Sequence, residues 1–332
     1  MTYSTTDSSR TVLVDPQFAV EPRDVVDFLS EFGPYNNRYI PRFPSDWASQ
    51  LRQHAEELAP KDPVKRQAIF ERIRRDAPLC TVPVSWKWDD ESSWRNNVQK
   101  SVSSDSNPLV VGHGLEPEPF LSWVDALEEI RETRRRSWPF RGSIAEYVES
   151  CLPLLLNSPS SYLIDPYIDV FSEAGEMILR SLFGRSKGSR CYSIQVITRR
   201  SACNSVIRGN DAPLMTDLEV DALLKRTYED VLPRNREIRL HLVTEGRVGG
   251  DALRLHDRFF LTTYGAINFG QGFFVVKQPQ PQQNAYVLDM NHHLALKHAY
   301  IDGTARFAER LPRLSTVAYP LHVDSFYCRS ST

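Results

Sequence analysis

The chain has 332 residues, of which 41% are hydrophobic and 25% are charged, a balance typical of folded globular proteins. Its 40 Lys and Arg and 42 Asp and Glu give a net charge of -2. This excludes a uniformly basic nucleic-acid-binding surface but leaves local basic patches open. No apolar run approaches the roughly 20 residues of a membrane-spanning helix, and five widely spaced cysteines argue against a disulfide framework or a thiolate zinc site. We expect a cytoplasmic protein.

The first half of the chain predicts a mainly helical α+β domain over residues 11–150, after a disordered tail at 1–10. Ser45 is placed to cap a helix that carries Trp47, Leu51 and Leu58, because a serine oxygen accepts from the first free amides of a helix. Apolar spacing and aromatic or β-branched content predict further elements: helices over 61–75 and 121–136, and a strand over 79–88.

An arginine-rich run follows the last of these helices, in the sequence RETRRRSWPFRGS. Arg134, Arg135 and Arg136 stand beside Trp138 and Phe140. Guanidinium groups bind phosphate oxygens in pairs and aromatic rings stack on bases, so the run is a candidate contact for a polyanion. The alternative is structural: the arginines complement the helix C-terminus and pair with the glutamates of the same helix.

The second half, residues 151–332, predicts an α/β domain with a mixed sheet. Strands and helices alternate first and antiparallel strands follow, a pattern typical of such sheets. The predicted strands are 160–171, broken at Asp165-Pro166, then 191–200, 236–246, the hairpin 253–263 and 267–276, and 284–290. Ser172 and Thr216 are expected to begin helices over 172–184 and 216–232, with Gly184 past the end of the first.

The most informative segments are LIDPYIDVF and LRLHDRFFLTTYGAINFGQGFFVVKQPQ. The second resembles the core of the phospholipase-D-like superfamily, whose active members carry His-x-Lys, an Asp shortly after it, and a downstream glycine turn. In that chemistry the histidine attacks phosphorus and the lysine neutralises the phosphoryl oxygens. Here His256 is present, but Arg258 replaces the lysine and Thr263 the aspartate. The resemblance therefore implies a degenerate active site.

Together, the DPYI segment and the HDRF segment resemble more closely the non-catalytic C-terminal domain of proteins with an N-terminal MIT domain. Similar segments occur in bacterial proteins of mobile-element and phage-defence loci. The resemblance covers residues 151–332 only, and residues 1–150 do not resemble an MIT bundle. It implies that Arg258, Gly270 and Gly272 line an anion-binding site. Arg134, Arg135 and Arg136 lie outside the resemblance and form a second candidate basic surface by their own chemistry.

Two structural alternatives stay open for these residues. Arg258 pairs with Asp257 or Asp165 in one of them, and His256 is an ordinary hydrogen-bonded strand residue in the other. Arg199 and Arg200 flank a predicted strand end and either ring an anion-binding edge or keep that edge soluble. His292, His293 and His298 have partly helical spacing, but nothing identifies a third well-placed ligand, so no metal or cofactor is expected.

The expected function is that of a non-catalytic recognition or scaffold subunit in a bacterial anti-phage defence or mobile-element complex. Its partner would be nucleic acid, in the first place DNA, or another subunit of that complex. The alternative is a metal-independent nuclease in which two chains dimerise to bring two copies of His256 together. A membrane partner is not expected, because the net charge is near zero and no basic amphipathic helix is found.

Overall fold

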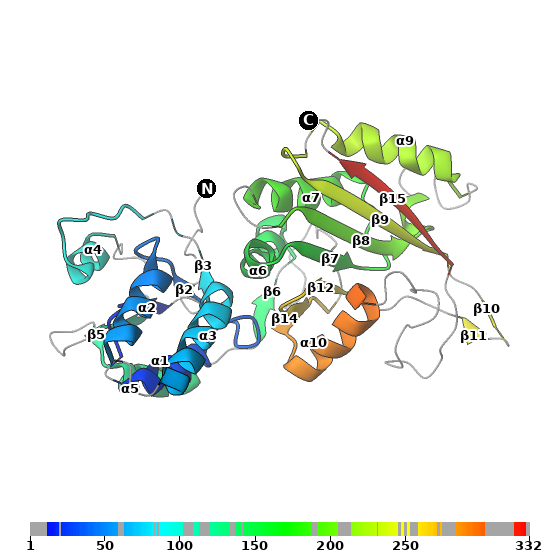
Figure 1. Ribbon diagram of the computed structural model, residues 1–332. Helices are drawn as coiled ribbons and strands as arrows, with labels where there is room; N and C mark the ends of the chain where they lie inside the picture. The colour runs from blue at the N-terminus through cyan, green and yellow to red at the C-terminus, as the bar shows by residue number, and fades with distance from the viewer. Residues whose placement is uncertain are drawn as a thin grey trace. The chain divides into compact units, whose positions relative to one another are not determined.

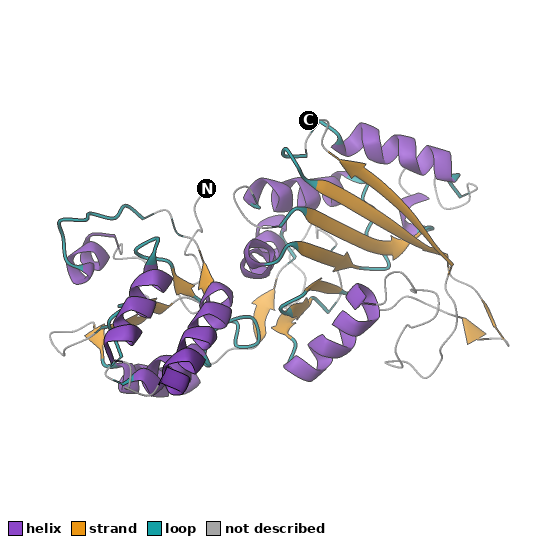
Figure 2. Ribbon diagram, in the orientation of Figure 1, coloured by secondary structure: helices purple, strands orange, loops and turns teal. Residues whose placement is uncertain are grey.

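The computed structural model divides the chain into two compact units, Met1–Arg136 and Ser137–Thr332 (Figures 1 and 2). The structure describes residues 12–19, 21–58, 63–82, 84, 86–101, 109–112, 120–132, 137–140, 142–186, 191–204, 214–230, 232–244, 247–248, 251–252, 258–270, 273, 283–302 and 322–329. In this described part of the chain, no helix combines the length and the apolarity needed to cross a bilayer.

The first unit combines helices with short parallel strands. Its helices are α1 (Pro22–Leu29), α2 (Trp47–Leu58), α3 (Pro63–Cys80), α4 (Trp94–Ser101) and α5 (Trp123–Glu132). Its strands are β1 (Val12–Val14), β2 (Ile40–Pro41), β3 (Thr81–Val82), β4 (Leu109–Val111) and β5 (Phe120–Leu121). The strands form one sheet in the order β1-β4-β5 and a second sheet of β2 and β3.

Helix α3 is longer than the sequence pattern predicts, and this shortens the strand expected after it. Ile73, Ala77 and Cys80 continue at helical spacing and are all buried in the core of the first unit. Burial of that face extends the helix to Cys80, because packing outweighs the local strand preference of the following residues. Of the strand predicted over 79–88, the described residues form only β3.

The second unit begins at Ser137 rather than at residue 151, because the segment before residue 151 belongs to its sheet and core. Strand β6 (Ser137–Phe140) pairs antiparallel with β14 (Gln283–Val287). Phe140 of this strand packs against Tyr147 and Phe269, with ring centroids 4.6 and 5.2 Å away. Tyr147 belongs to α6 (Ile144–Asn157), so this helix joins the same core.

One mixed sheet of eight strands organises the second unit, in the order β15-β9-β8-β7-β12-β13-β14-β6. Besides β6 and β14, its strands are β7 (Ser160–Ile164), β8 (Ser193–Arg199), β9 (Glu237–Thr244), β12 (Phe259–Thr262), β13 (Ala266–Asn268) and β15 (His322–Arg329). Strands β7, β8 and β9 are parallel, and the remaining pairings are antiparallel. A separate ribbon pairs β10 (Arg247–Val248) with β11 (Asp251–Ala252).

Helices flank this sheet, which confirms the expected mixed α/β architecture (Figure 1). They are α6, α7 (Glu173–Arg185), α9 (Asp217–Tyr228) and α10 (Met290–Leu296), with the short 3-10 helix η2 (Ala202–Asn204) and the π-helix η3 (Lys297–Asp302). The predicted caps Ser172 and Thr216 are confirmed, since each side chain accepts from a backbone amide of its helix. Gly184 lies inside α7, which ends at the cap Ser186, so its predicted place after the helix is wrong.

The two faces of the sheet differ in what covers them. Alternate residues of β8 and β9 on one face, including Val196, Leu240 and Leu242, are fully buried. Figure 1 shows α7 and α9 beside this part of the sheet. On the other face, Leu296 of α10 and Tyr300 of η3 pack with Tyr162 and neighbouring residues of the sheet. Helices therefore cover part of both faces of the sheet, and α9 contacts the edge strand β15.

Candidate anion-binding site

Three chain segments that are far apart in sequence meet at one edge of the mixed sheet. Asp165 directly follows β7, and Arg199 is the last residue of the neighbouring parallel strand β8. Strand β12 runs antiparallel to β7, and its first residue Phe259 pairs with Ile164. Arg258 therefore arrives at the same edge from the opposite direction. Ligands of open α/β sheets commonly bind at such carboxyl ends.

Tyr167 brings the two arginines together. The guanidinium carbon of Arg199 lies 4.6 Å from the centre of the Tyr167 ring, and that of Arg258 lies 5.0 Å from it. The ring face attracts each cation, and 53% of Tyr167 is exposed. Two positive groups are thus held beside one accessible aromatic ring. We call Asp165, Tyr167, Arg199 and Arg258 the strand-end cluster.

Asp165 forms the floor of the strand-end cluster. It is 1% exposed, and its two oxygens accept from the backbone amides of Tyr167 at 2.8 Å and Phe273 at 2.5 Å. Burial raises the pKa of this carboxyl, although the two amides and the nearby Arg258 and Arg199 act in the opposite direction. The carboxyl therefore fixes the turn that carries Tyr167 and ties it to the loop after β13.

Arg258 is oriented by the glycine turn that the sequence singled out. Its Nη1 donates to the carbonyl oxygen of Gly270 at 3.0 Å. Gly270 has a φ of +59°, a region that side chains other than glycine rarely adopt, and its amide donates to Asn268 Oδ1 at 2.6 Å. The amide of Gly270 is thus already used within the turn, and this residue contributes to the site by holding Arg258.

The turn between β7 and α7 is fixed from three sides. Thr198 Oγ1 donates to the carbonyl of Ile168 at 2.9 Å, and the Tyr228 hydroxyl donates to the carbonyl of Val170. A Cβ on Gly175 would collide with the Asp169 carbonyl, so glycine permits α7 to begin directly against this turn. The ring of Tyr167 is therefore presented by a rigid support.

Several predicted site residues lie outside the described residues. These are His256, Gly272, Arg134, Arg135 and Arg136. Of the two arginines at the end of β8, Arg199 joins the strand-end cluster. Arg200 instead bonds Asp217 at 2.5 Å and Asp324 at 2.7 Å, which fixes α9 against β15. Thr263, the second position at which the sequence departs from the phospholipase-D-like pattern it resembles, follows β12 at the end away from Arg258.

The neighbouring histidines of α10 do not gather around one point. His293 is fully buried and hydrogen-bonds the carbonyl of Thr262 at 2.9 Å, whereas His292 bonds the capping carboxylate of Asp289 at 2.7 Å. Among the residues that the structure describes, no group of three or more His, Cys, Asp or Glu is placed to hold a metal ion.

Sequence reasoning did not identify Tyr167 as a site residue. The signal was its place two residues after Asp165, since an Asp-Pro turn at a strand end directs the next side chains to the sheet edge. Taken together, the described cluster offers one exposed aromatic face and two guanidinium groups over a buried carboxylate. Such a set of groups binds and orients an anion.

The fold and the strand-end cluster define the chain as a mixed α/β protein with a candidate anion-binding edge. Comparison of the sequence with protein-family models and with curated proteins finds no match in either case.

Proposed function

We propose that the chain is a non-catalytic recognition module that binds a phosphate group of a nucleic acid at the strand-end cluster. The observation that supports this most directly is the pair of guanidinium groups, 4.6 and 5.0 Å from the centre of the one exposed ring of Tyr167. Arginine is suited to phosphate because its planar fork of donors matches two phosphate oxygens at once.

We propose recognition without catalysis because of the ionisable side chains in the strand-end cluster. An arginine keeps its proton throughout the accessible pH range and can hold a phosphoryl group. Both oxygens of the neighbouring Asp165 accept hydrogen bonds from backbone amides, so this carboxylate holds the turn in place. Thr263 stands where active proteins of the superfamily that this segment resembles carry an aspartate. Binding is therefore better supported than hydrolysis.

The resemblance to bacterial mobile-element and phage-defence proteins supplies the setting of the proposal. In that setting the chain would act as a subunit that recognises nucleic acid, DNA in the first place, for a larger complex. A subunit that contacts only other proteins of the complex would share the fold but would not need a phosphate-binding edge. The binding experiment below distinguishes the two.

The test measures the affinity of the full chain for a fluorescently labelled DNA by anisotropy over a series of salt concentrations. Arg258→Gln should weaken binding by about tenfold and lower the slope of log affinity against log salt by about one. Arg258→Lys should recover only part of the loss, because lysine keeps the charge without the fork. Arg23→Gln is the control, since Arg23 is an 84% exposed arginine of the other unit.

Three results would overturn the proposal. DNA affinity that is independent of salt, or equal in Arg258→Gln and the unaltered chain, would remove the phosphate-binding role of the strand-end cluster. If the chain binds no DNA at all, a protein partner is favoured. Cleavage of DNA that persists in EDTA and is lost in His256→Ala would replace recognition by the dimeric nuclease alternative.

A further inference from the structure

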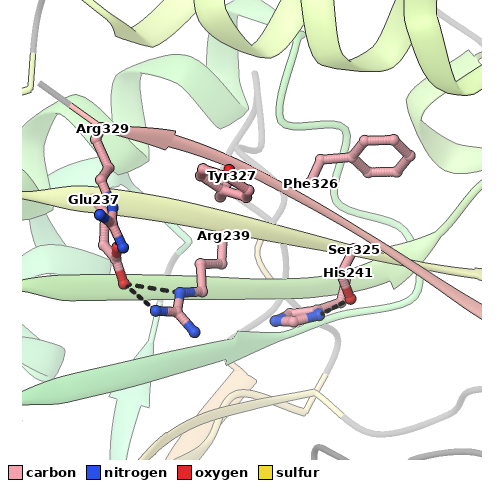
Figure 3. A pocket seen from close by; sticks show the side chains of 7 residues that line it. All are labelled: Glu237, Arg239, His241, Ser325, Phe326, Tyr327 and Arg329. Atoms are coloured by element: carbon pink, nitrogen blue, oxygen red, sulfur yellow. Dashed lines mark hydrogen bonds and ion pairs between the residues drawn. The ribbon is translucent and has the colours of Figure 1, made fainter. Parts of the chain in front are cut away.

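A groove opens on one face of the sheet, over the neighbouring strands β9 and β15. It lies at the end of β9 opposite to the strand-end cluster. A cavity of about 280 Å³ lies over β9 and β15, and a second cavity of about 340 Å³ continues from it toward the start of β8. Glu237, Arg239 and Arg329 line both. We call the combined surface the sheet-face groove; Figure 3 shows the side chains of its first part.

Glu237 holds two arginines of the groove in place. Its side chain is 8% exposed, and its carboxylate bonds Arg239 Nη2 at 2.7 Å and Arg329 Nε at 2.9 Å. The two arginines come from neighbouring strands, because Glu237 pairs with Arg329 in the β9–β15 register. The side chains of Arg239 and Arg329 remain 44% and 68% exposed. Each guanidinium is thus ordered on one edge and open to solvent on another.

The polar floor of the groove is neutral. His241 Nε2 hydrogen-bonds Gln195 Oε1 at 3.0 Å, and its Nδ1 hydrogen-bonds Ser325 Oγ at 2.8 Å. Gln195 donates its own amide to the Tyr162 hydroxyl at 3.0 Å, so this row crosses β7, β8, β9 and β15. Burial, together with the charge of Arg239, lowers the pKa of His241 to about 4. The imidazole therefore adds no charge to the groove near pH 7.

The described lining residues carry an excess of positive charge. The arginines are Arg236, Arg239 and Arg329, and the acidic residue among them is Glu237. This leaves two positive charges in excess on a chain whose net charge is -2. The occupant that complements this surface is therefore anionic.

Two exposed aromatic rings stand beside these charges. Tyr327 of β15 is 63% exposed, and Tyr192, directly before β8, is 51% exposed. Tyr327 lines the first cavity and Tyr192 the second. An exposed tyrosine ring beside a guanidinium group offers a flat apolar face on which a planar group can stack. The groove therefore suits a ligand that carries both planar rings and negative charge.

We propose that the sheet-face groove binds a single-stranded nucleic acid, with bases stacked on Tyr327 and Tyr192 and phosphates on Arg239 and Arg329. Exposed rings on an open sheet stack on unpaired bases, and arginines beside them follow the backbone. The bases of a duplex are already stacked on one another and offer no free face to the tyrosines. The groove therefore favours single strands over duplex.

This inference concerns a surface separate from the strand-end cluster. Arg239 of the groove pairs with Gln195, which lies four residues, about 13 Å, before Arg199 on β8. The buried Ile197, packed with Tyr300 of η3, lies between Gln195 and Arg199. The two sites can therefore be tested one at a time, and the failure of one does not remove the other.

The experiment measures anisotropy of a fluorescein-labelled thymidine homopolymer with the full chain, beside a uridine homopolymer and a duplex of the same length. Tyr327→Ala and Tyr192→Ala should each weaken binding of the single strands by about fivefold or more. Tyr327→Phe should retain the affinity, because the ring that stacks is kept. Tyr286→Ala is the matched control, since Tyr286 is a 39% exposed tyrosine of β14 in the same sheet.

Thermal melting of each variant establishes that it is folded. Because both tyrosines are exposed, we expect little change in melting temperature. Single-strand affinity that is unchanged in both alanine variants would overturn the inference, as would tighter binding of the duplex than of either homopolymer. If Arg258→Gln weakens DNA binding while the tyrosine variants do not, the strand-end proposal stands and this one fails. The reverse result would support the sheet-face groove and remove the strand-end site.

Discussion

The two faces of strand β9 show how one stretch of sequence serves both stability and recognition. On one face Ile238, Leu240 and Leu242 are all fully buried. On the other face Glu237, Arg239 and His241 line the sheet-face groove. The two sets alternate residue by residue, because successive side chains of a strand point to opposite faces of the sheet.

The two faces of β9 should tolerate substitutions to different degrees. The buried face gains its free energy from close packing, so it accepts few side chains at each position. The groove face is held by a polar row and one clamped carboxylate, and its exposed rings contribute little to folding. We therefore expect substitutions on the buried face to change the free energy of unfolding, and substitutions on the groove face to change the affinity for nucleic acid.

The largest effect should come from the buried face. Leu240→Ala removes a fully buried side chain and should lower the free energy of unfolding by about 2–5 kcal/mol. Urea denaturation followed by circular dichroism measures this loss. The folded fraction should bind single-stranded DNA as the unaltered chain does.

Tyr327→Ala supplies the contrast on the groove face of the neighbouring strand. Because Tyr327 is 63% exposed, its replacement should change the free energy of unfolding by no more than about 0.5 kcal/mol. A loss comparable to that of Leu240→Ala would contradict the division between the two faces.

An intermediate effect is expected at Glu237, which belongs to the groove but is nearly buried. Glu237→Gln removes the charge that pairs Arg239 and Arg329 and should cost about 1 kcal/mol of unfolding free energy. The groove gains one positive charge in net terms, so affinity for single-stranded DNA should rise about threefold. Denaturation and anisotropy on the same preparation measure both changes.

The two outcomes for affinity at Glu237 have different meanings. A rise shows that net charge governs binding. A fall shows that the ordering of the two arginines by the carboxylate matters more than its charge, because loosened side chains must be ordered again when the ligand binds.

His241 should make the stability of the folded chain depend on pH. Burial and Arg239 lower its pKa from 6.5 to about 4 in the folded chain. Between these values the unfolded chain binds a proton that the folded chain does not. Stability contributed by the neutral imidazole is therefore lost as the pH falls from about 6.5 toward 4.

His241→Gln isolates this contribution, because glutamine does not titrate and keeps a donor and an acceptor on the side chain. Urea midpoints measured between pH 7 and pH 5 should fall less in the variant than in the unaltered chain. If the urea midpoints of the two proteins fall equally with pH, His241 has the same protonation in the folded and the unfolded chain. Asp165 titrates with a raised pKa, and it is present in both proteins, so its contribution cancels in the comparison.

Local patterns predicted much of the second unit. The caps Ser172 and Thr216, strands β8 and β9, and the hairpin of β12 and β13 all follow from residues close together in sequence. Such features depend on neighbouring backbone groups and on the alternation of side chains, which sequence spacing records directly.

Other features depended on contacts between distant segments. The start of the second unit at Ser137 follows from the pairing of β6 with β14, and the length of α3 follows from burial of Cys80. The polar alternation of β9 was visible in the sequence, but only the register with β15 showed that Glu237 and Arg329 face each other.

The sequence by itself determined the mixed α/β class and the glycine turn, and it singled out Arg258 as a candidate site residue. Only the tertiary structure decided which groups meet Arg258, because Tyr167 and Arg199 reach it from other strands. It also turned Gly270 from an expected ligand contact into the support of that arginine. The physical reason is that spacing along a chain fixes which face a residue occupies, whereas strand order and register fix its neighbours.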